Sequence, residues 1–186
     1  MRLRRLAGQA LVALGGAVSL LAYMVALGSF LPEEYVAGRT IRLKHSPEAV
    51  WQTITDYEGQ SAWRRGVRGV ERLPDHDGRE VWREVHERST PVTFETTEAT
   101  RPRRLVRSIA DEDGAAAERL EYEITPTEGG GSLLTVVEHG SVRNPLSRFV
   151  ARFVTGRGAC VEQYLEELAD RLEESAARAR TGDNCQ

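Results

Sequence analysis

Three kinds of feature are scarce in this sequence. The chain has two cysteines, Cys160 and Cys185, a single lysine, Lys44, and a formal net charge of only -3 over 186 residues. Two cysteines do not make the framework of a disulfide-stapled fold, and there is no CxxC motif or zinc spacing. A slightly negative chain also lacks the basic field that non-specific nucleic-acid binding requires. We therefore predict no disulfide scaffold and no nucleic-acid partner.

The sequence also lacks the short motifs that commonly identify an enzyme or a cofactor site. No serine lies in a GxSxG elbow, and the glycines at 129–131 match neither a P-loop nor a dinucleotide fingerprint. No two histidines have the i, i+4 spacing of a helical metal site, which would need three or four ligands in all. We predict no metal and no cofactor. The four histidines are His45, His76, His86 and His139.

A long uncharged segment is present near the start of the chain. Residues 10–31 contain no charged side chain, and as a helix they would be roughly 30 Å long, about the thickness of a bilayer core. Three arginines lie in the basic N-terminus, residues 1–9, and two glutamates follow the apolar segment. The positive-inside rule then places the N-terminus in the cytoplasm. We predict a single-pass membrane protein whose folded domain is extracytoplasmic.

Two other interpretations of this segment stay open. A cleaved signal peptide has a shorter apolar core and a small-residue cleavage site, and Ala26-Leu27-Gly28 resembles such a site. The apolar run nevertheless continues to Leu31. A buried helix of a soluble protein is the other alternative, although such a helix is rarely apolar on every face beside an otherwise polar chain.

The remainder of the chain is expected to form one domain over residues 39–180, after a linker at 32–38. Arg39–His45 alternates between polar and apolar residues, as a half-buried strand does. Ser46 and Pro47 then have the residue types of a helix N-cap and a first helical position.

A second short helix is expected around Gly59–Arg65, and from Val67 onward the hydrophobic pattern has a period of two. This pattern predicts six more strands joined by hairpins, and therefore a mostly antiparallel sheet covered by helices on one face. The six strands are expected at Val67–Leu73, Glu80–Glu87, Thr90–Ala99, Arg104–Ala110, Arg119–Thr125 and Ser132–Val142, with turns at 74–78, 111–115 and 128–131.

The last strand leads into a long amphipathic stretch from Asn144 to about Arg180. Asn144 and Pro145 predict its N-cap and first residue, and apolar residues recur in steps of three and four. Gly156-Arg157-Gly158 interrupts the apolar stripe, so a kink or break is expected there. We expect the part after this break to cover the sheet, and residues 181–186 to form a disordered tail.

This order of elements and several sequence motifs resemble the START-like, or SRPBCC, superfamily. The resemblance covers about residues 38–175, and it implies an α+β helix-grip fold, an antiparallel seven-stranded sheet wrapped on a long C-terminal helix. It also implies a hydrophobic cavity that holds a lipid, a polyketide or another apolar small molecule. The motifs are HSPEAVW at 45–51, Trp63, VWRE at 81–84, VTFE at 92–95, PRRLV at 102–106, LTVVE at 134–138 and NPL at 144–146.

Strand parity and helix position give a set of candidate ligand-binding residues. Such residues are as consistent with plain core as with ligand contact, because ligand pockets are themselves mostly apolar. Phe149 and Phe153 are expected at the mouth of the cavity. The full set is Trp63, Trp82, Phe94, Tyr122, Val136, Phe149, Phe153 and Tyr164.

Glu84 and Glu138 are the candidate catalytic groups. If both side chains point inward, their desolvated carboxyl groups could act as general acid or base. The alternative is that both lie near strand ends, solvated or paired with an arginine.

Eight arginines could form either a basic face toward anionic lipid or an ordinary solvated surface. They are Arg64, Arg65, Arg68, Arg72, Arg101, Arg103, Arg104 and Arg107.

Three functions are consistent with these observations. The first is a membrane-anchored binding or carrier domain for an apolar small molecule. The second is an enzyme of the cyclase or dehydrase kind, which needs inward carboxylates. The third is a protein-interaction domain whose cavity is filled by its own side chains.

Overall fold

The structure is a computed structural model that describes residues 2–87, 90–110, 116–154 and 158–182. Its chain divides into two compact units. The first comprises Met1–Tyr35 and Ser141–Arg157, and the second comprises Val36–Gly140 and Gly158–Gln186.

The first unit consists of two helices, α1 (Arg2–Ser29) and α3 (Pro145–Phe153). Within α1, Val12–Ser29 has a mean hydropathy of 1.8 and is 6% buried, so this helix is long and apolar enough to cross a membrane. It begins at Arg2, inside the segment expected to be a separate basic N-terminus, and it ends two residues before Leu31.

Helix α3 packs on the C-terminal end of α1. As predicted, Asn144 caps it, and its side chain accepts hydrogen bonds from the backbone N–H groups of Leu146 and Ser147. The buried Arg148 donates to the carbonyl of Leu31 at 2.8 Å. Gly28 is required at this contact, because a Cβ there would overlap the carbonyl oxygen of Pro145.

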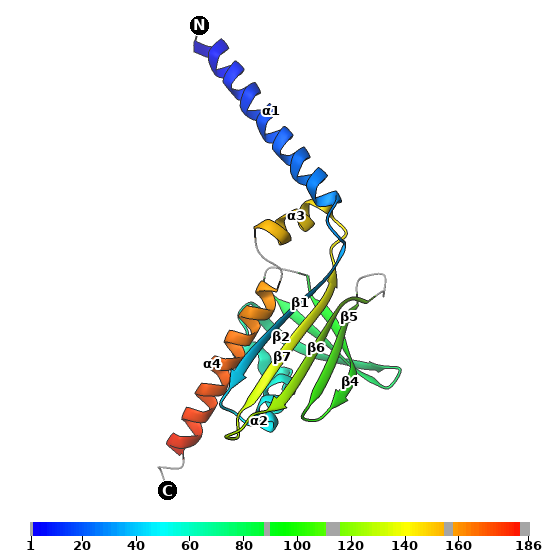
Figure 1. The fold of residues 1–186 in the computed structure, drawn as a ribbon, viewed down its shortest axis with the longest axis vertical. Helices are drawn as coiled ribbons and strands as arrows, with labels where there is room; N and C mark the ends of the chain where they lie inside the picture. Colours follow the sequence, from blue (N-terminus) through cyan, green and yellow to red (C-terminus); the bar gives the residue numbers. More distant parts are fainter. Residues whose placement is uncertain (1, 88–89, 111–115, 155–157, 183–186) are drawn as a thin grey trace. The chain divides into compact units, whose positions relative to one another are not determined.

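The second unit contains a seven-stranded sheet with the order β1-β7-β6-β5-β4-β3-β2 (Figure 1). Strands β2 to β7 pair antiparallel, each with its neighbour along the chain. Gly129 and Gly130 have φ values of 92° and 84° in the last hairpin turn, which favours glycine there. The strands are β1 (Glu34–Leu43), β2 (Val67–His76), β3 (Arg79–His86), β4 (Val92–Thr100), β5 (Arg104–Ala110), β6 (Ala116–Pro126) and β7 (Ser132–Ser141).

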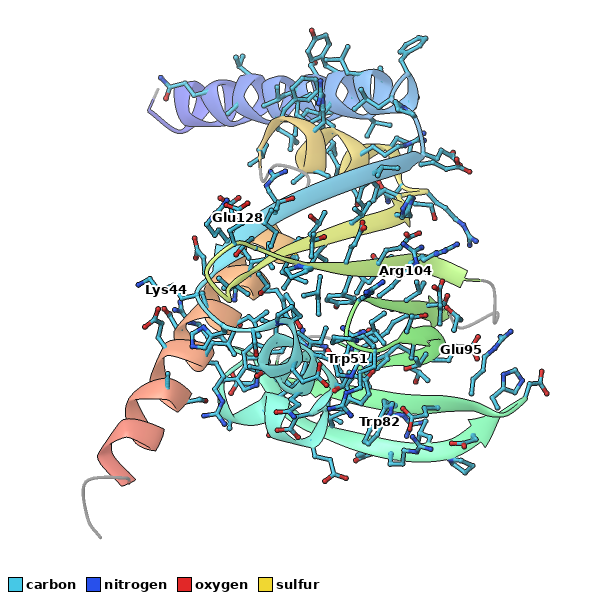
Figure 2. All side chains as sticks on the ribbon, turned by 60° about the horizontal axis from the view of Figure 1, so that its bottom comes forward. Lys44, Trp51, Trp82, Glu95, Arg104 and Glu128 are labelled. Atoms are coloured by element: carbon cyan, nitrogen blue, oxygen red, sulfur yellow. The ribbon has the colours of Figure 1, made fainter. Side chains whose placement is uncertain are left out.

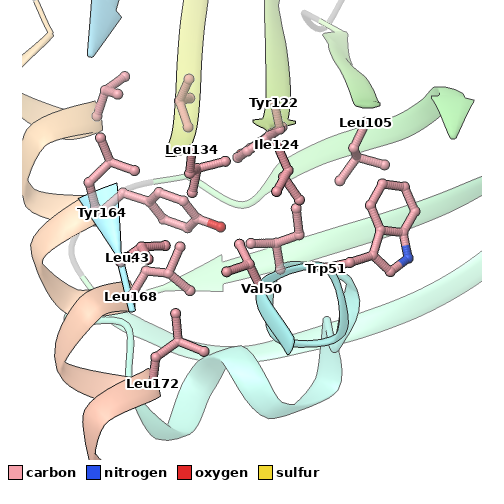
Figure 3. Close-up of a cluster of buried hydrophobic side chains, with 14 residues drawn as sticks. Leu43, Val50, Trp51, Leu105, Tyr122, Ile124, Leu134, Tyr164, Leu168 and Leu172 are labelled. Carbon is pink, nitrogen blue, oxygen red and sulfur yellow. The ribbon is translucent and has the colours of Figure 1, made fainter. Parts of the chain in front are cut away.

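Helices α2 (Pro47–Thr55) and α4 (Ala159–Gly182) cover one face of this sheet, and the 3-10 helix η1 (Glu58–Ala62) follows α2. Ser46 caps α2 as predicted, accepting a hydrogen bond from the Ala49 N–H at 3.3 Å. Figure 3 shows how side chains of both helices meet those of the sheet. Burial of this apolar surface is the main stabilising contribution. The fully or nearly fully buried members include Val50, Ile54, Leu105, Tyr122, Ile124, Leu134, Val136, Leu168 and Leu172.

The predicted α+β helix-grip architecture is confirmed, with some boundaries corrected. The linker expected at 32–38 is wrong in part, because β1 already begins at Glu34. The first residues of β1 are mostly exposed, and backbone pairing holds them in the strand. They therefore lack the alternation of apolar and polar residues from which a strand is predicted. Strand β2 likewise continues to His76, through most of the expected turn at 74–78.

The long C-terminal stretch is two helices and not one. Helix α3 ends at Phe153 and α4 begins at Ala159, on either side of the predicted break. Helix α4 then continues to Gly182, beyond the expected domain end at residue 180. The turn expected at 111–115, the residues Gly156 and Arg157, and the end of the predicted tail at 183–186 lie outside the described residues.

Ion pairs away from the core cluster link neighbouring strands. Arg104 on β5 donates to Glu121 on β6 at 2.8 Å, and Arg79 on β3 donates to Glu95 on β4 at 3.1 Å. Figure 2 shows the positions of Arg104 and Glu95 on the sheet. Such partly exposed pairs contribute little stability, typically about 0–1 kcal/mol each.

Candidate functional site

A cavity of about 360 Å³ lies between the sheet and α4 in the second unit. Its walls are largely apolar, but seven ionisable side chains of Arg, Glu, His and Cys type and two tyrosines also reach it. The lining residues are Arg64, Glu84, His86, Val92, Phe94, Arg107, Ile109, Glu118, Leu120, Tyr122, Val136, Glu138, Cys160, Val161 and Tyr164.

One group of polar residues, here called the arginine cluster, consists of Arg64, Glu84, Arg107, Tyr122 and Tyr164. Arg64 Nη1 donates to Glu84 Oε1 at 2.7 Å. The same carboxylate oxygen lies 3.9 Å from Arg107 Nη1. One buried carboxylate is therefore shared by two guanidinium groups, and the other carboxylate oxygen is 3.5 Å from His86 Nε2.

Aromatic rings surround the guanidinium of Arg107. Its Cζ lies 4.4 Å from the ring centroid of Phe94, 5.1 Å from that of Tyr122 and 5.6 Å from that of Tyr57. Its Nη2 also donates to the Tyr122 hydroxyl. An arginine keeps its charge when buried, and the ring faces stabilise that charge by cation–π interaction. The cation is consequently held in one position at the cavity wall.

Tyr164 extends from α4 toward the sheet (Figure 3) and is the member of the arginine cluster that α4 contributes to the cavity wall. Its ring lies under the Arg64 guanidinium, whose Cζ is 5.4 Å from the ring centroid. Burial raises the pKa of the Tyr164 hydroxyl well above its usual range, and the neighbouring Tyr122 raises it further. The hydroxyl therefore stays protonated and can serve as a hydrogen-bond donor at any physiological pH.

A second group, here called the carboxylate cluster, consists of Glu118, Glu138 and Cys160. Glu118 and Glu138 lie on the neighbouring strands β6 and β7, and Cys160 lies at the start of α4. Burial, and then repulsion from Glu138, raises the pKa of Glu118. The pKa of the Cys160 thiol is raised by burial and by both carboxylates. Glu118 is thus the group here that can retain a proton at less acidic pH than usual.

The structure brings together half of the predicted ligand-binding residues. Phe94, Tyr122, Val136 and Tyr164 line the cavity, as do both candidate carboxylates, Glu84 and Glu138. This placement follows from strand parity, since β7 alternates regularly between more and less buried residues.

The other predicted residues lie elsewhere. Trp63 packs beside the core cluster, with its ring 5.7 Å from that of Tyr164, and the ring of Trp82 lies 4.9 Å from that of Tyr57 at a tilt of 51°. Phe149 and Phe153 belong to α3 in the first unit, with their rings 4.9 Å apart. None of these four is among the residues that line the described cavity.

The basic surface suggested for eight arginines is wrong for Arg107. This side chain is 3% exposed and Arg64 is only half-buried, whereas Arg65, Arg68 and Arg72 are exposed. The signal in the sequence was strand parity, because Arg107 occupies an inward position between Leu105 and Ile109. Parity could also have found Glu118, two residues before Leu120, but the expected strand began only at Arg119, and a polar residue at an inward position is ordinarily assigned to solvent.

Within the part of the chain that the structure describes, no group of three or more His, Cys, Asp or Glu side chains could hold a metal ion.

Comparison with known protein families identifies the family of this chain. Residues 37–174 match the family described as polyketide cyclase / dehydrase and lipid transport. The chain belongs to this family. No match was found among curated proteins.

Solved structures with the same fold have low sequence identity to this protein. A START superfamily protein from Mycobacterium smegmatis is 17% identical, with a TM-score of 0.60, 75% of this chain covered and 97% of that one. The Zhui aromatase/cyclase from Streptomyces sp. R1128 is 14% identical, with a TM-score of 0.60 and coverages of 77% and 96%. Norcoclaurine synthase from Thalictrum flavum is 8% identical, with a TM-score of 0.59 and the same coverages. At these identities the likeness establishes the fold alone.

Proposed function

We propose that this protein is a membrane-anchored binding or carrier domain for an apolar small molecule, either a lipid or a polyketide-like compound. The cavity of about 360 Å³ carries the proposal, because it has the size and the mostly apolar walls of a small-molecule site. The family description includes lipid transport, which supports the same function.

The ligand can be tested by native mass spectrometry of the full chain purified in detergent. The wild type should carry an added mass that Leu120→Trp loses, because the larger side chain fills the cavity. Arg119→Trp changes the neighbouring, half-exposed residue of the same strand and should keep the ligand. A binding function for this cavity would be contradicted if both variants kept the added mass equally, or if the wild type carried no bound compound.

Attachment to the membrane is the second part of the proposal. The apolar window of α1 supports it, as do the exposed Phe30, Phe153 and Val154 in the same unit. Expressed protein should stay in the membrane after an alkaline wash and should have the intact mass of the whole chain, 20.7 kDa. Protease added outside the cytoplasmic membrane should digest the folded domain. A shorter mature chain would indicate a signal peptide, and a protected domain would contradict the proposed orientation.

A cyclase- or dehydrase-type enzyme is the second candidate function, favoured by the raised pKa of Glu118 beside Glu138 in the cavity. The compounds bound to the wild type and to Glu118→Gln and Glu138→Gln separate the two functions. An enzyme should accumulate an unreacted compound on the variants, whereas a carrier should hold the same compound on all three proteins.

A further inference from the structure

Two buried polar groups at the cavity wall have no hydrogen-bond partner among the described residues. They are the Nε and Nη1 atoms of Arg107 and the hydroxyl of Tyr164. The two side chains are 3% and 9% exposed, and both line the cavity. Buried donors in proteins are nearly always paired, and leaving one unpaired is unfavourable. Both unpaired groups therefore point to an acceptor that the chain itself does not supply.

The charges of the arginine cluster lead to the same conclusion. Glu84 Oε1 is already bonded to Arg64 at 2.7 Å, so its 3.9 Å approach to Arg107 is a weaker second contact. Two cations thus share one anion, and the cluster retains one positive charge in excess. Cation–π contacts offset part of the cost of burying this charge, whereas pairing and hydrogen bonding would stabilise it further.

The geometry of Arg107 leaves its donors available. The guanidinium carbon lies over the rings of Phe94 and Tyr122, and the Tyr122 hydroxyl accepts from Nη2. The group has five N–H donors in one plane, and the donors at Nε and Nη1 have no acceptor among the described residues.

From these observations we infer that Arg107 and Tyr164 form a subsite for the carboxylate head of an amphiphilic ligand. This inference rests on the proposed binding function and specifies its ligand class. One negative charge matches the excess positive charge of the cluster, and Nε, Nη1 and the tyrosine hydroxyl supply donors for its two oxygens. The apolar part of the ligand lies against Val92, Ile109, Leu120, Val136 and Val161.

The carboxylate cluster fixes the direction in which such a ligand binds. Glu118 and Glu138 line the same cavity, and they repel an anionic head while leaving an apolar tail unaffected. A phosphate monoester head carries up to two negative charges, more than the single excess cation can balance, and it would meet stronger repulsion from these glutamates. The charges therefore favour a carboxylic acid over an alkyl phosphate.

The test compares two probes of nearly equal shape, decanoic acid and decanamide, by native mass spectrometry of the full chain. The wild type should bind decanoate at least about tenfold more tightly than decanamide, since a hydrogen bond to a charged group contributes about 1.5–3 kcal/mol. Arg107→Gln should abolish this preference and leave decanamide binding within about twofold. Tyr164→Phe should weaken decanoate binding about threefold or more, because one donor is lost.

Arg104→Gln is the matched control, since Arg104 lies on the same strand but pairs with Glu98 and Glu121. It should keep the full preference for decanoate. If Arg107→Gln does not fold, Arg107→Lys and Tyr164→Phe provide the same comparison with less disturbance of the buried site.

Each remaining outcome has one meaning. Equal binding of decanoate and decanamide by the wild type would overturn the carboxylate subsite but leave the proposed binding function intact. Tighter binding of decyl phosphate than of decanoate would overturn the carboxylate class. Absence of binding by all three probes, with no co-purified compound, would overturn the proposed function and this inference with it.

Discussion

The two polar clusters of the cavity differ in what controls their charge. In the arginine cluster, a guanidinium that never loses its proton is held by aromatic rings and shares one carboxylate with Arg64. In the carboxylate cluster, Glu118 has a raised pKa and lies beside Glu138. Arg107 thus carries a charge that pH does not change, whereas Glu118 changes charge with pH. At neutral pH the arginine cluster would attract an anionic ligand head and the carboxylate cluster would repel it. In acid this repulsion would be weaker.

The largest effect is expected from the carboxylate that the two arginines share. Glu84→Ala leaves Arg64 and Arg107 without a counter-ion and should lower the free energy of unfolding by about 3 kcal/mol. Thermal unfolding of the full chain in detergent, followed by circular dichroism, measures this loss. Glu80→Ala is the control, because this glutamate of the same strand has a 54% exposed side chain paired with Arg72. It should cost less than about 1 kcal/mol, and equal losses would mean that the cluster is not a buried charge network.

A smaller effect should reveal the aromatic contacts of Arg107. Phe94→Leu should lower the free energy of unfolding by about 1–2 kcal/mol, partly through packing and partly through the lost cation–π contact. A double-mutant cycle with Arg107→Met isolates the second part, for which we expect a coupling of about 1 kcal/mol. A coupling near zero would show that the ring only packs against the guanidinium.

The smallest effect concerns Glu118 and depends on pH. Because its pKa is raised in the folded protein, its contribution to stability is present below the pKa of the unfolded chain and is lost as pH rises through the folded pKa. Glu118→Gln cannot ionise, so it should match the wild type in acid and be more stable above neutral pH, by less than about 1 kcal/mol because the side chain is half-buried. The unfolding midpoints of both proteins between pH 4 and pH 8 measure this difference.

The origin of this pH dependence can be checked separately. Repulsion from Glu138 is the second cause of the raised pKa, after burial. In a Glu138→Gln background, the advantage of Glu118→Gln at high pH should therefore shrink. An unchanged advantage would assign the whole effect to burial.

Much of the fold could be predicted from particular residues. Ser46-Pro47 and Asn144-Pro145 located two helix starts because capping is a local interaction. Period-two alternation located strands β2 to β7, with errors mainly at their ends. The early start of β1 was missed, because backbone pairing by an exposed strand leaves little hydrophobic pattern.

For the site, sequence alone indicated which side faces inward for strands β3, β4, β6 and β7. It placed Glu84, Phe94, Tyr122, Val136 and Glu138 on cavity-facing positions, since side chains alternate strictly along a strand. It could not determine which inward residues reach one another. That depends on strand register and on the packing of α4, which bring Arg107 to Tyr122 and Tyr164 over long sequence separations. Only the tertiary structure decided that Arg107 is a buried cation with unpaired donors, because burial and pairing are properties of the assembled cavity.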